Sequence, residues 1–140
     1  MSEKDLQEKI FQFQVLEDKF KELNQKRELF TIKLAELEQT KQAIDDIAGS
    51  NDDEILIPLG SGVFVPGKLE KKEKMIVSLG ENAAMEKDVE EIKSILEKRR
   101  KILEEGIESV KKSMLNIAQE MQAIQVEAQE LLHKEEEKAG

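Results

Sequence analysis

The chain of 140 residues contains no cysteine, no tryptophan and no tyrosine, and only one histidine. Without cysteine it has neither disulfide bonds nor thiolate metal sites, which is compatible with a reducing compartment. The one histidine, His133, lies in a charged C-terminal stretch, where we expect a solvated helix residue. Alone it provides neither a metal site nor the base of a catalytic triad. The sequence therefore predicts no metal and no cofactor.

Aromatic residues make up 4% of the chain, fewer than a compact globule of this size uses to fill its core. Charged residues make up 38%, which is typical of long amphipathic helices. The net charge of −9 argues against nucleic acid and anionic membrane as partners, since both require a positive surface. No apolar run approaches the roughly 18 residues of a membrane span, and no signal peptide is visible. We expect a soluble, cytoplasmic protein.

The first segment, from about Ser2 to Ala48, is expected to be one long helix. Ser2 and Asp5 resemble a capping box, and Gly49 is a natural helix terminator. Its apolar stripe advances by alternating steps of three and four residues, the heptad pattern of a coiled coil. The stripe contains Leu16, Phe20, Leu23, Arg27, Phe30, Leu34, Leu37, Lys41, Ile44 and Ala48. Leu6, Ile10 and Phe13 continue it toward the N-terminus, with one slip of phase near Phe13.

The last segment, from about Asp88 to the C-terminus, has the same pattern. Asp88 is a suitable N-cap, and Glu91 completes a capping box. The stripe contains Met85, Val89, Ile92, Leu96, Arg99, Leu103, Gly106, Val110, Ser113 and Ile117, and after a change of phase Met121, Ile124, Ala128 and Leu131. Two helices of similar length with facing stripes, joined by a compact middle, should fold back as an antiparallel hairpin.

The middle of the chain changes from a helical period to short apolar runs. The stretches 55–59, 63–69, 75–79 and 83–86 are predicted to be four strands, separated by GSG, EKKEK and GEN turns. The first three are apolar at nearly every position, so both faces need cover that about thirty residues of sheet cannot supply. We therefore expect oligomerisation through this region. The residues predicted to carry it are Ile55, Ile57, Val63, Phe64, Val65, Met75, Val77 and Leu79.

One stretch, GSGVFVPGKL (60–69), nearly matches the phosphate-binding loop G-x-x-x-x-G-K-[ST]. The position that requires a metal-binding hydroxyl is Leu69, the residues between the glycines favour a strand, and Pro66 removes an amide donor. No helix is expected directly after it, although a phosphate loop needs one. We interpret Gly60 and Gly62 as a hairpin turn instead.

The fold class expected is mainly α: a long antiparallel coiled-coil hairpin with two β-hairpins at its bend, which assemble into an intersubunit β-barrel. One domain would have three parts: an N-terminal coiled-coil helix over 1–49, a β-hairpin assembly region over 50–87 and a C-terminal coiled-coil helix over 88–140. The numerous carboxylates lie near lysine or arginine at helical spacing, which is typical of solubilising pairs. Nothing in the pattern indicates an enzyme.

The chain resembles the alpha-class subunit of prefoldin, a hexameric chaperone of archaea and eukaryotes. The resemblance is carried by ILIPLGSGVFVPGKL (55–69), IVSLG (76–80), MEKD (85–88) and ILEKR (95–99), and by four strands between the helices. It implies a hexamer of two alpha-type and four beta-type subunits, whose strands form a double β-barrel that bears six coiled-coil arms. It further implies an ATP-independent holdase that binds unfolded clients at the arm tips and delivers them to a group II chaperonin. The sequence departs from the family pattern at Ala83-Ala84, so a homo-oligomer or a filament stays open beside the heterohexamer.

In a hairpin whose bend is the sheet, both chain termini lie at the arm tip. The client-binding residues expected there are Leu6, Ile10, Phe11, Phe13, Val126, Leu131 and Leu132. Phe11 lies beside the main stripe and is the best candidate for exposure. Two other classes of function stay open at this point: a structural coiled-coil scaffold, which would have no affinity for denatured proteins, and a nucleotide hydrolase, which would need Lys68 for ATP binding.

Overall fold

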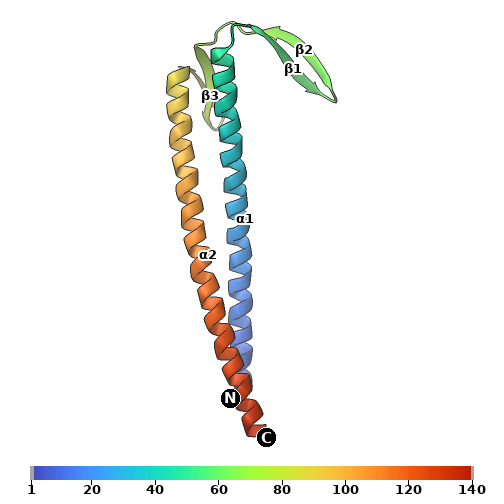
Figure 1. The fold of residues 1–140 in the computed structure, drawn as a ribbon, viewed down its shortest axis with the longest axis vertical. Coiled ribbons are helices and arrows are strands. Elements are labelled where there is room, and N and C mark those ends of the chain that lie inside the picture. The colour runs from blue at the N-terminus through green and yellow to red at the C-terminus, as the bar shows by residue number, and fades with distance from the viewer. Residues whose placement is uncertain (1, 140) are drawn as a thin grey trace. The chain divides into compact units, whose positions relative to one another are not determined.

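A computed structural model describes residues 2–139, which form two long helices and four strands (Figure 1). The elements are α1 (Ser2–Gly49), β1 (Glu54–Gly60), β2 (Val63–Lys68), β3 (Lys74–Gly80), β4 (Ala83–Asp88) and α2 (Val89–Ala139). The mainly helical fold with two small antiparallel hairpins is confirmed. Met85, which helical spacing had joined to the stripe of α2, lies in β4.

The described residues pack as two compact units. One unit, called the arm unit below, contains the chain up to Lys33 and from Leu103 onward. The other, called the sheet unit, contains Leu34–Ile102 and therefore both hairpins.

In the arm unit, the segments of α1 and α2 run antiparallel and side by side (Figure 1). Lys9 Nζ lies 2.5 Å from Glu127 Oε2, and the backbone of Gly106 faces the ring of Phe30. Lys9 and Phe30 are 21 residues apart, as are Gly106 and Glu127. The two helices therefore keep one register between these contacts.

The seam of α1 in the arm unit follows the heptad pattern without interruption. Its partly buried side chains include Leu6, Lys9, Phe13, Leu16, Phe20, Leu23, Arg27 and Phe30. The predicted slip of phase near Phe13 is wrong, because Lys9 and not Ile10 occupies the seam. The aliphatic stem of a lysine can lie along apolar surface while its ammonium group reaches a carboxylate, here that of Glu127. Ile10 is consequently exposed.

The sheet unit is held together by a small apolar core. The buried side chains are Ile44, Val77, Val89, Ile92 and Leu96, with Leu37, Met75 and Ile95 packed against them. The core thus joins the end of α1, the start of α2 and strand β3. β1–β2 and β3–β4 form separate two-stranded sheets. Figure 1 shows β1–β2 projecting away from the helices of this unit, whereas β3 lies alongside them.

Both hairpins close with a two-residue turn in the left-handed region of backbone space. Ser61 and Gly62 have φ values of 52° and 78°, and Glu81 and Asn82 have values of 27° and 61°. Glycine precedes each turn in a β-bulge, where Gly60 has a φ of 108°. The predicted hairpin turn at Gly60–Gly62 is confirmed.

Lys72, in the loop between the hairpins, anchors the chain at the C-terminal end of α1. Its Nζ donates to the backbone oxygens of Ser50 and Asp52 at 2.6 and 3.0 Å, and lies 3.1 Å from Asp53 Oδ1. Within the described residues, the last turn of α1 contains no basic side chain. Lys72 therefore supplies the positive charge that a helix C-terminus favours. We refer to these three contacts as the Lys72 anchor.

Candidate functional site

The β1–β2 hairpin presents apolar side chains on both of its faces. Ile57 pairs with Val65 and Pro58 pairs with Phe64, so neighbouring pairs alternate between the faces. One face carries Ile55, Ile57, Leu59, Val63 and Val65, and the other carries Leu56, Pro58, Phe64 and Pro66. Leu56 and Leu59 are each 67% exposed, and Ile57, Val63, Phe64 and Val65 are also exposed. The chain itself leaves both faces of this hairpin open to solvent.

Pro58 and Pro66 occupy positions where this hairpin needs no backbone N–H. Leu69 N–H donates to Asp53 O at 2.8 Å, which makes these residues a hydrogen-bonded pair of the ladder. Hydrogen-bonded and non-hydrogen-bonded pairs alternate along an antiparallel ladder, so Pro58 and Pro66 fall in non-hydrogen-bonded pairs. The backbone nitrogen at each position therefore points outward from the edge of the hairpin. Each edge therefore lacks one donor that a neighbouring strand could otherwise use.

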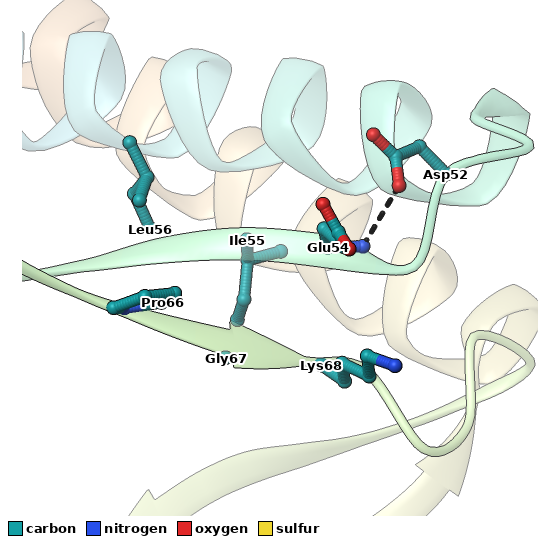
Figure 2. A pocket seen from close by; sticks show the side chains of 7 residues that line it. All are labelled: Asp52, Glu54, Ile55, Leu56, Pro66, Gly67 and Lys68. Carbon is teal, nitrogen blue, oxygen red and sulfur yellow. Dashed lines mark hydrogen bonds between the residues drawn. The ribbon is translucent and has the colours of Figure 1, made fainter.

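The base of this hairpin contains an open hollow of about 470 Å³ (Figure 2). It is lined by Asp52, Glu54, Ile55, Leu56, Pro66, Gly67 and Lys68. Figure 2 shows the neighbouring side chains of Ile55 and Leu56 pointing in opposite directions from β1. Asp52 Oδ1 accepts a hydrogen bond from Glu54 N–H at 3.0 Å, which shapes the charged end of the hollow. The lining combines apolar side chains with charged groups at one end, a combination that is common where two proteins meet.

Gly67 keeps one part of this hairpin compact. A Cβ atom at this position would lie 3.1 Å from Ile57 Cδ1 and 3.6 Å from Ile55 Cγ1. The isoleucines thus cover the backbone of Gly67, and a larger residue would displace Ile57.

The β3–β4 hairpin differs from the first because one of its faces is already covered. Val77 is 7% exposed and belongs to the core of the sheet unit, and Met75 packs against that core. The expectation that Val77 offers an assembly surface is therefore wrong, because alternation turns this residue toward the helices. Ile76 on the opposite face is 76% exposed. Arg99 Nη2 also donates to Ser78 O at 2.8 Å and ties α2 to β3.

The sequence prediction omitted four exposed apolar side chains of the hairpins, Leu56, Leu59, Ile76 and Met85. A signal was present, since the stretch 55–59 is apolar at every position and its residues must alternate between two faces. Of the other predicted assembly residues, Leu79 is exposed and Ile55 is partly buried.

A second apolar surface lies in the arm unit, near the ends of the two helices. Phe11 is 67% exposed, and Ile10, Val126 and Leu132 are exposed as well. Leu6, Phe13 and Leu131 are partly buried in the seam between the helices. The seven predicted tip residues thus divide into four open and three partly covered side chains, with Phe11 the most open.

Two ion pairs of the sheet unit shift the pKa of a charged group. A hydrogen bond from Lys93 Nζ to the Asp45 carboxylate, 2.8 Å away, raises the pKa of Lys93. Arg100 donates to Glu97, with 2.9 Å between its Nε and Glu97 Oε2, and lowers the pKa of that carboxyl. Both pairs lie on partly exposed helix surfaces, where Lys93 and Asp45 link α2 to α1 and Arg100 and Glu97 pair within α2. Ion pairs of this kind are structural.

The described residues contain no constellation suited to catalysis by a metal. Within residues 2–139, no three acidic, histidine or cysteine side chains converge closely enough to hold a metal ion. His133 Nε2 lies 3.4 Å from Glu137 Oε1 on an exposed helix face. The residues between Gly62 and Lys68 form strand β2, and the chain continues into a loop and β3 rather than into a helix. None of the helices described over 2–139 is long and apolar enough to cross a membrane.

The fold and its surfaces define a class of protein: a coiled-coil chain in which two long helices flank a pair of apolar β-hairpins. Comparison with known proteins identifies the family. A family model described as "Prefoldin subunit" matches residues 16–134. The chain is 29% identical over 134 residues to prefoldin subunit alpha of Pyrococcus horikoshii, which covers 94% of this chain and 90% of that protein. It is 33% identical over 99 residues to prefoldin subunit alpha 1 of Thermococcus kodakarensis, and this alignment covers 70% of this chain and 68% of that protein.

A solved structure has the same fold. The cryo-EM structure of filamentous PFD from Methanocaldococcus jannaschii matches with a TM-score of 0.72 at 20% identity, covering 86% of this chain and 98% of that chain. The chain belongs to the prefoldin family of chaperones, as an alpha-type subunit of the archaeal kind.

Proposed function

We propose that this chain is a subunit of an ATP-independent holdase, which binds unfolded polypeptides at the ends of its coiled-coil arms. The observation that carries the proposal is the open apolar surface of the arm unit, made by Ile10, Phe11, Val126 and Leu132. Unfolded clients expose apolar segments. Several weak contacts on different arms would together bind a client more tightly than any one contact does. The net charge of −9 would keep the empty chaperone soluble.

Assembly is the second part of the proposal. The β1–β2 hairpin, apolar and exposed on both faces, would be covered by strands of other prefoldin subunits in a β-barrel. The open hollow at its base would receive a side chain of the neighbouring subunit. The expected complex contains two alpha-type and four beta-type subunits, and a homo-oligomer or filament is the alternative. β3–β4 would contribute mainly through Ile76, which lies on the face opposite the core, and through Leu79, which is exposed next to the turn.

Delivery to a group II chaperonin is the third part, and membership of the prefoldin family supports it. Transfer of a labelled unfolded client from the assembled complex to such a chaperonin, without ATP at the handover, would test it. A client that stays on the arms when chaperonin is added would contradict this part.

The holdase proposal is tested by suppression of aggregation of a denatured client. Replacing Ile10, Phe11, Val126 and Leu132 with glutamine should abolish suppression while the native mass stays unchanged, because all four side chains are exposed. Leu115→Gln, which changes another exposed leucine of the arm unit, is the matched control and should keep suppression. Full suppression by the four-residue variant would refute binding at the arm end. A wild-type complex that assembles but suppresses nothing would favour a purely structural scaffold.

The assembly proposal is tested by native mass, measured with and without a beta-type subunit. Val65→Asp should leave the chain folded and helical but unable to assemble, because it places an unpaired charge on a face that must become buried. An unaltered oligomer would contradict this role of the hairpin.

A further inference from the structure

Two neighbouring residues near the start of α1, Lys9 and Ile10, lie in different surroundings. The side chain of Lys9 is 30% exposed and lies in the seam with α2, whereas Ile10 is 49% exposed and belongs to the open apolar surface of the arm unit. Neighbours along an α-helix are about 100° apart around its axis, so these two side chains cannot face α2 at the same time. The residue that occupies the seam therefore decides whether Ile10 is available to a client.

Hydrophobicity and the phase of the seam favour different residues at this turn. Burial in the seam would remove more apolar surface from water for Ile10 than for a lysine. Leu6, Lys9, Phe13 and Leu16, however, continue the alternating steps of three and four residues, whereas Ile10 would introduce two successive steps of three before Leu16. Because only Leu6 precedes it in the seam, this turn can change its phase without disturbing the rest of the helix.

Two neighbouring residues of α2 favour Lys9 over Ile10. Glu127 Oε2 lies 2.5 Å from Lys9 Nζ. The next residue, Ala128, is partly buried in the seam and offers less apolar surface to Ile10 than Ile124 or Leu131 would at the same level. An ion pair with this exposure is weak by itself, but it adds to the phase of the seam and to the small side chain of Ala128.

We propose that Lys9 and Glu127 are positioning residues for client binding, which hold the first turns of α1 in the phase that keeps Ile10 on the open surface. This inference rests on the proposed holdase function and adds two charged residues to it. Neither residue needs to contact the client, because both act through the orientation of Ile10. When the pair is made repulsive, the first turns of α1 rotate, Ile10 enters the seam and the client surface loses one of its four apolar side chains.

The decisive variant is Lys9→Glu, which places a second carboxylate beside Glu127. The charge-reversed pair, Lys9→Glu with Glu127→Lys, restores the attraction, and Lys9→Arg keeps it. Lys21→Glu is the matched control, since it changes the net charge by the same amount on the same helix. The ion pair that it breaks, with Glu17 at 3.4 Å, lies within α1 and does not reach α2.

The first measurement locates Ile10 and does not depend on client binding. In the assembled complex, the δ1-methyl group of Ile10 is observed by NMR, and its relaxation by a soluble paramagnetic agent reports its exposure. Lys9→Glu should lower this relaxation, and the charge-reversed pair should restore it, whereas Ile32, which is 56% exposed in the same unit, should not change. Unchanged relaxation at Ile10 in Lys9→Glu overturns the inference. Increased relaxation also overturns it, because the arm end would then have frayed instead of rotated.

The second measurement is suppression of aggregation of a denatured client. Lys9→Glu should raise the concentration of complex needed for half suppression about fivefold or more, because each arm loses the contact of a half-exposed isoleucine. The charge-reversed pair, Lys9→Arg and Lys21→Glu should stay within about twofold of the wild type. A wild-type complex that suppresses nothing refutes the holdase proposal. Normal suppression by both the wild type and Lys9→Glu refutes only the positioning role of the ion pair.

Discussion

Replacing Gly106 with alanine tests whether the close contact with Phe30 sets the spacing of the two arm helices. Alanine is favoured over glycine in a helix interior by about 1 kcal/mol, so propensity alone predicts stabilisation. A Cβ at Gly106, however, would lie 3.0 Å from Phe30 Cε2, 3.3 Å from Cδ2 and 3.7 Å from Cζ. Overfilling a packed contact of this kind costs about 1 to 3 kcal/mol. We therefore expect Gly106→Ala to lower the free energy of unfolding by about 0 to 2 kcal/mol, the difference between these two effects.

When the ring of Phe30 is removed, Gly106→Ala should raise the free energy of unfolding instead of lowering it. In a Phe30→Leu background the Cβ has room, so Gly106→Ala should stabilise the arm by about 1 kcal/mol. The double-mutant cycle then gives a coupling of about 1 to 3 kcal/mol between the two positions, as expected for residues in contact. Ala118→Gly, on an exposed face of the same helix, calibrates the difference between alanine and glycine here.

The assay is urea unfolding of the assembled complex followed by circular dichroism at 222 nm, which reports on helix content. If Gly106→Ala stabilises the wild-type chain by the full amount measured at Ala118, Phe30 does not occupy the space that this glycine leaves. A coupling near zero would refute the reasoning in the same way.

Three further predictions concern the sheet unit. Lys72→Met should reduce stability by about 1 to 2 kcal/mol in urea unfolding, because it removes three contacts to the segment that follows α1, whereas Lys71→Met should change it little; equal effects would contradict the Lys72 anchor. Val77→Asp should unfold the β3–β4 hairpin at a cost above about 3 kcal/mol, whereas Val65→Asp should leave monomer stability nearly unchanged, as measured on the isolated chain. Arg100 lowers the pKa of the Glu97 carboxyl from its ordinary value of 4.5. The stability that this ion pair contributes is therefore fully present above about pH 4.5 and is lost as the pH falls through the lowered pKa. The difference in melting temperature between wild type and Glu97→Gln should therefore be full at pH 7 and vanish in acid; a constant difference would contradict the pairing.

The sequence predicts the helices and strands well because each is set by a local period. In the helices the apolar residues are spaced by three and four positions, and in the strands they are continuous, with glycine at the turns. Both patterns can be recognised in the sequence without knowledge of tertiary contacts. Which of two neighbouring residues lies in the seam between the helices is harder to predict. Hydrophobicity favoured Ile10 for the seam, but Lys9 lies there because Glu127, far away in the sequence, is its partner.

The same distinction applies to the candidate surfaces. That the hairpins need cover follows from their apolar runs, yet Val77 is covered by the chain's own helices while Leu56 and Leu59 are open. Only the packing of β3 against α1 and α2 separates these two cases. Lys72 likewise lies in a charged loop that resembles a solvated turn, and its role depends on carbonyl oxygens some twenty residues earlier.

The Lys72 anchor has a consequence for how this region can be exchanged between proteins. Together with the bond from Leu69 N–H to Asp53 O, it closes the base of the β1–β2 hairpin into a ring running from Ser50 to Lys72. The two ends of this segment are therefore bonded to each other rather than only to the helices. We expect that residues 50–72 could be transplanted as one cassette into other alpha-class chains, and that subunit preference would travel with it while the recipient's helices stay as they are.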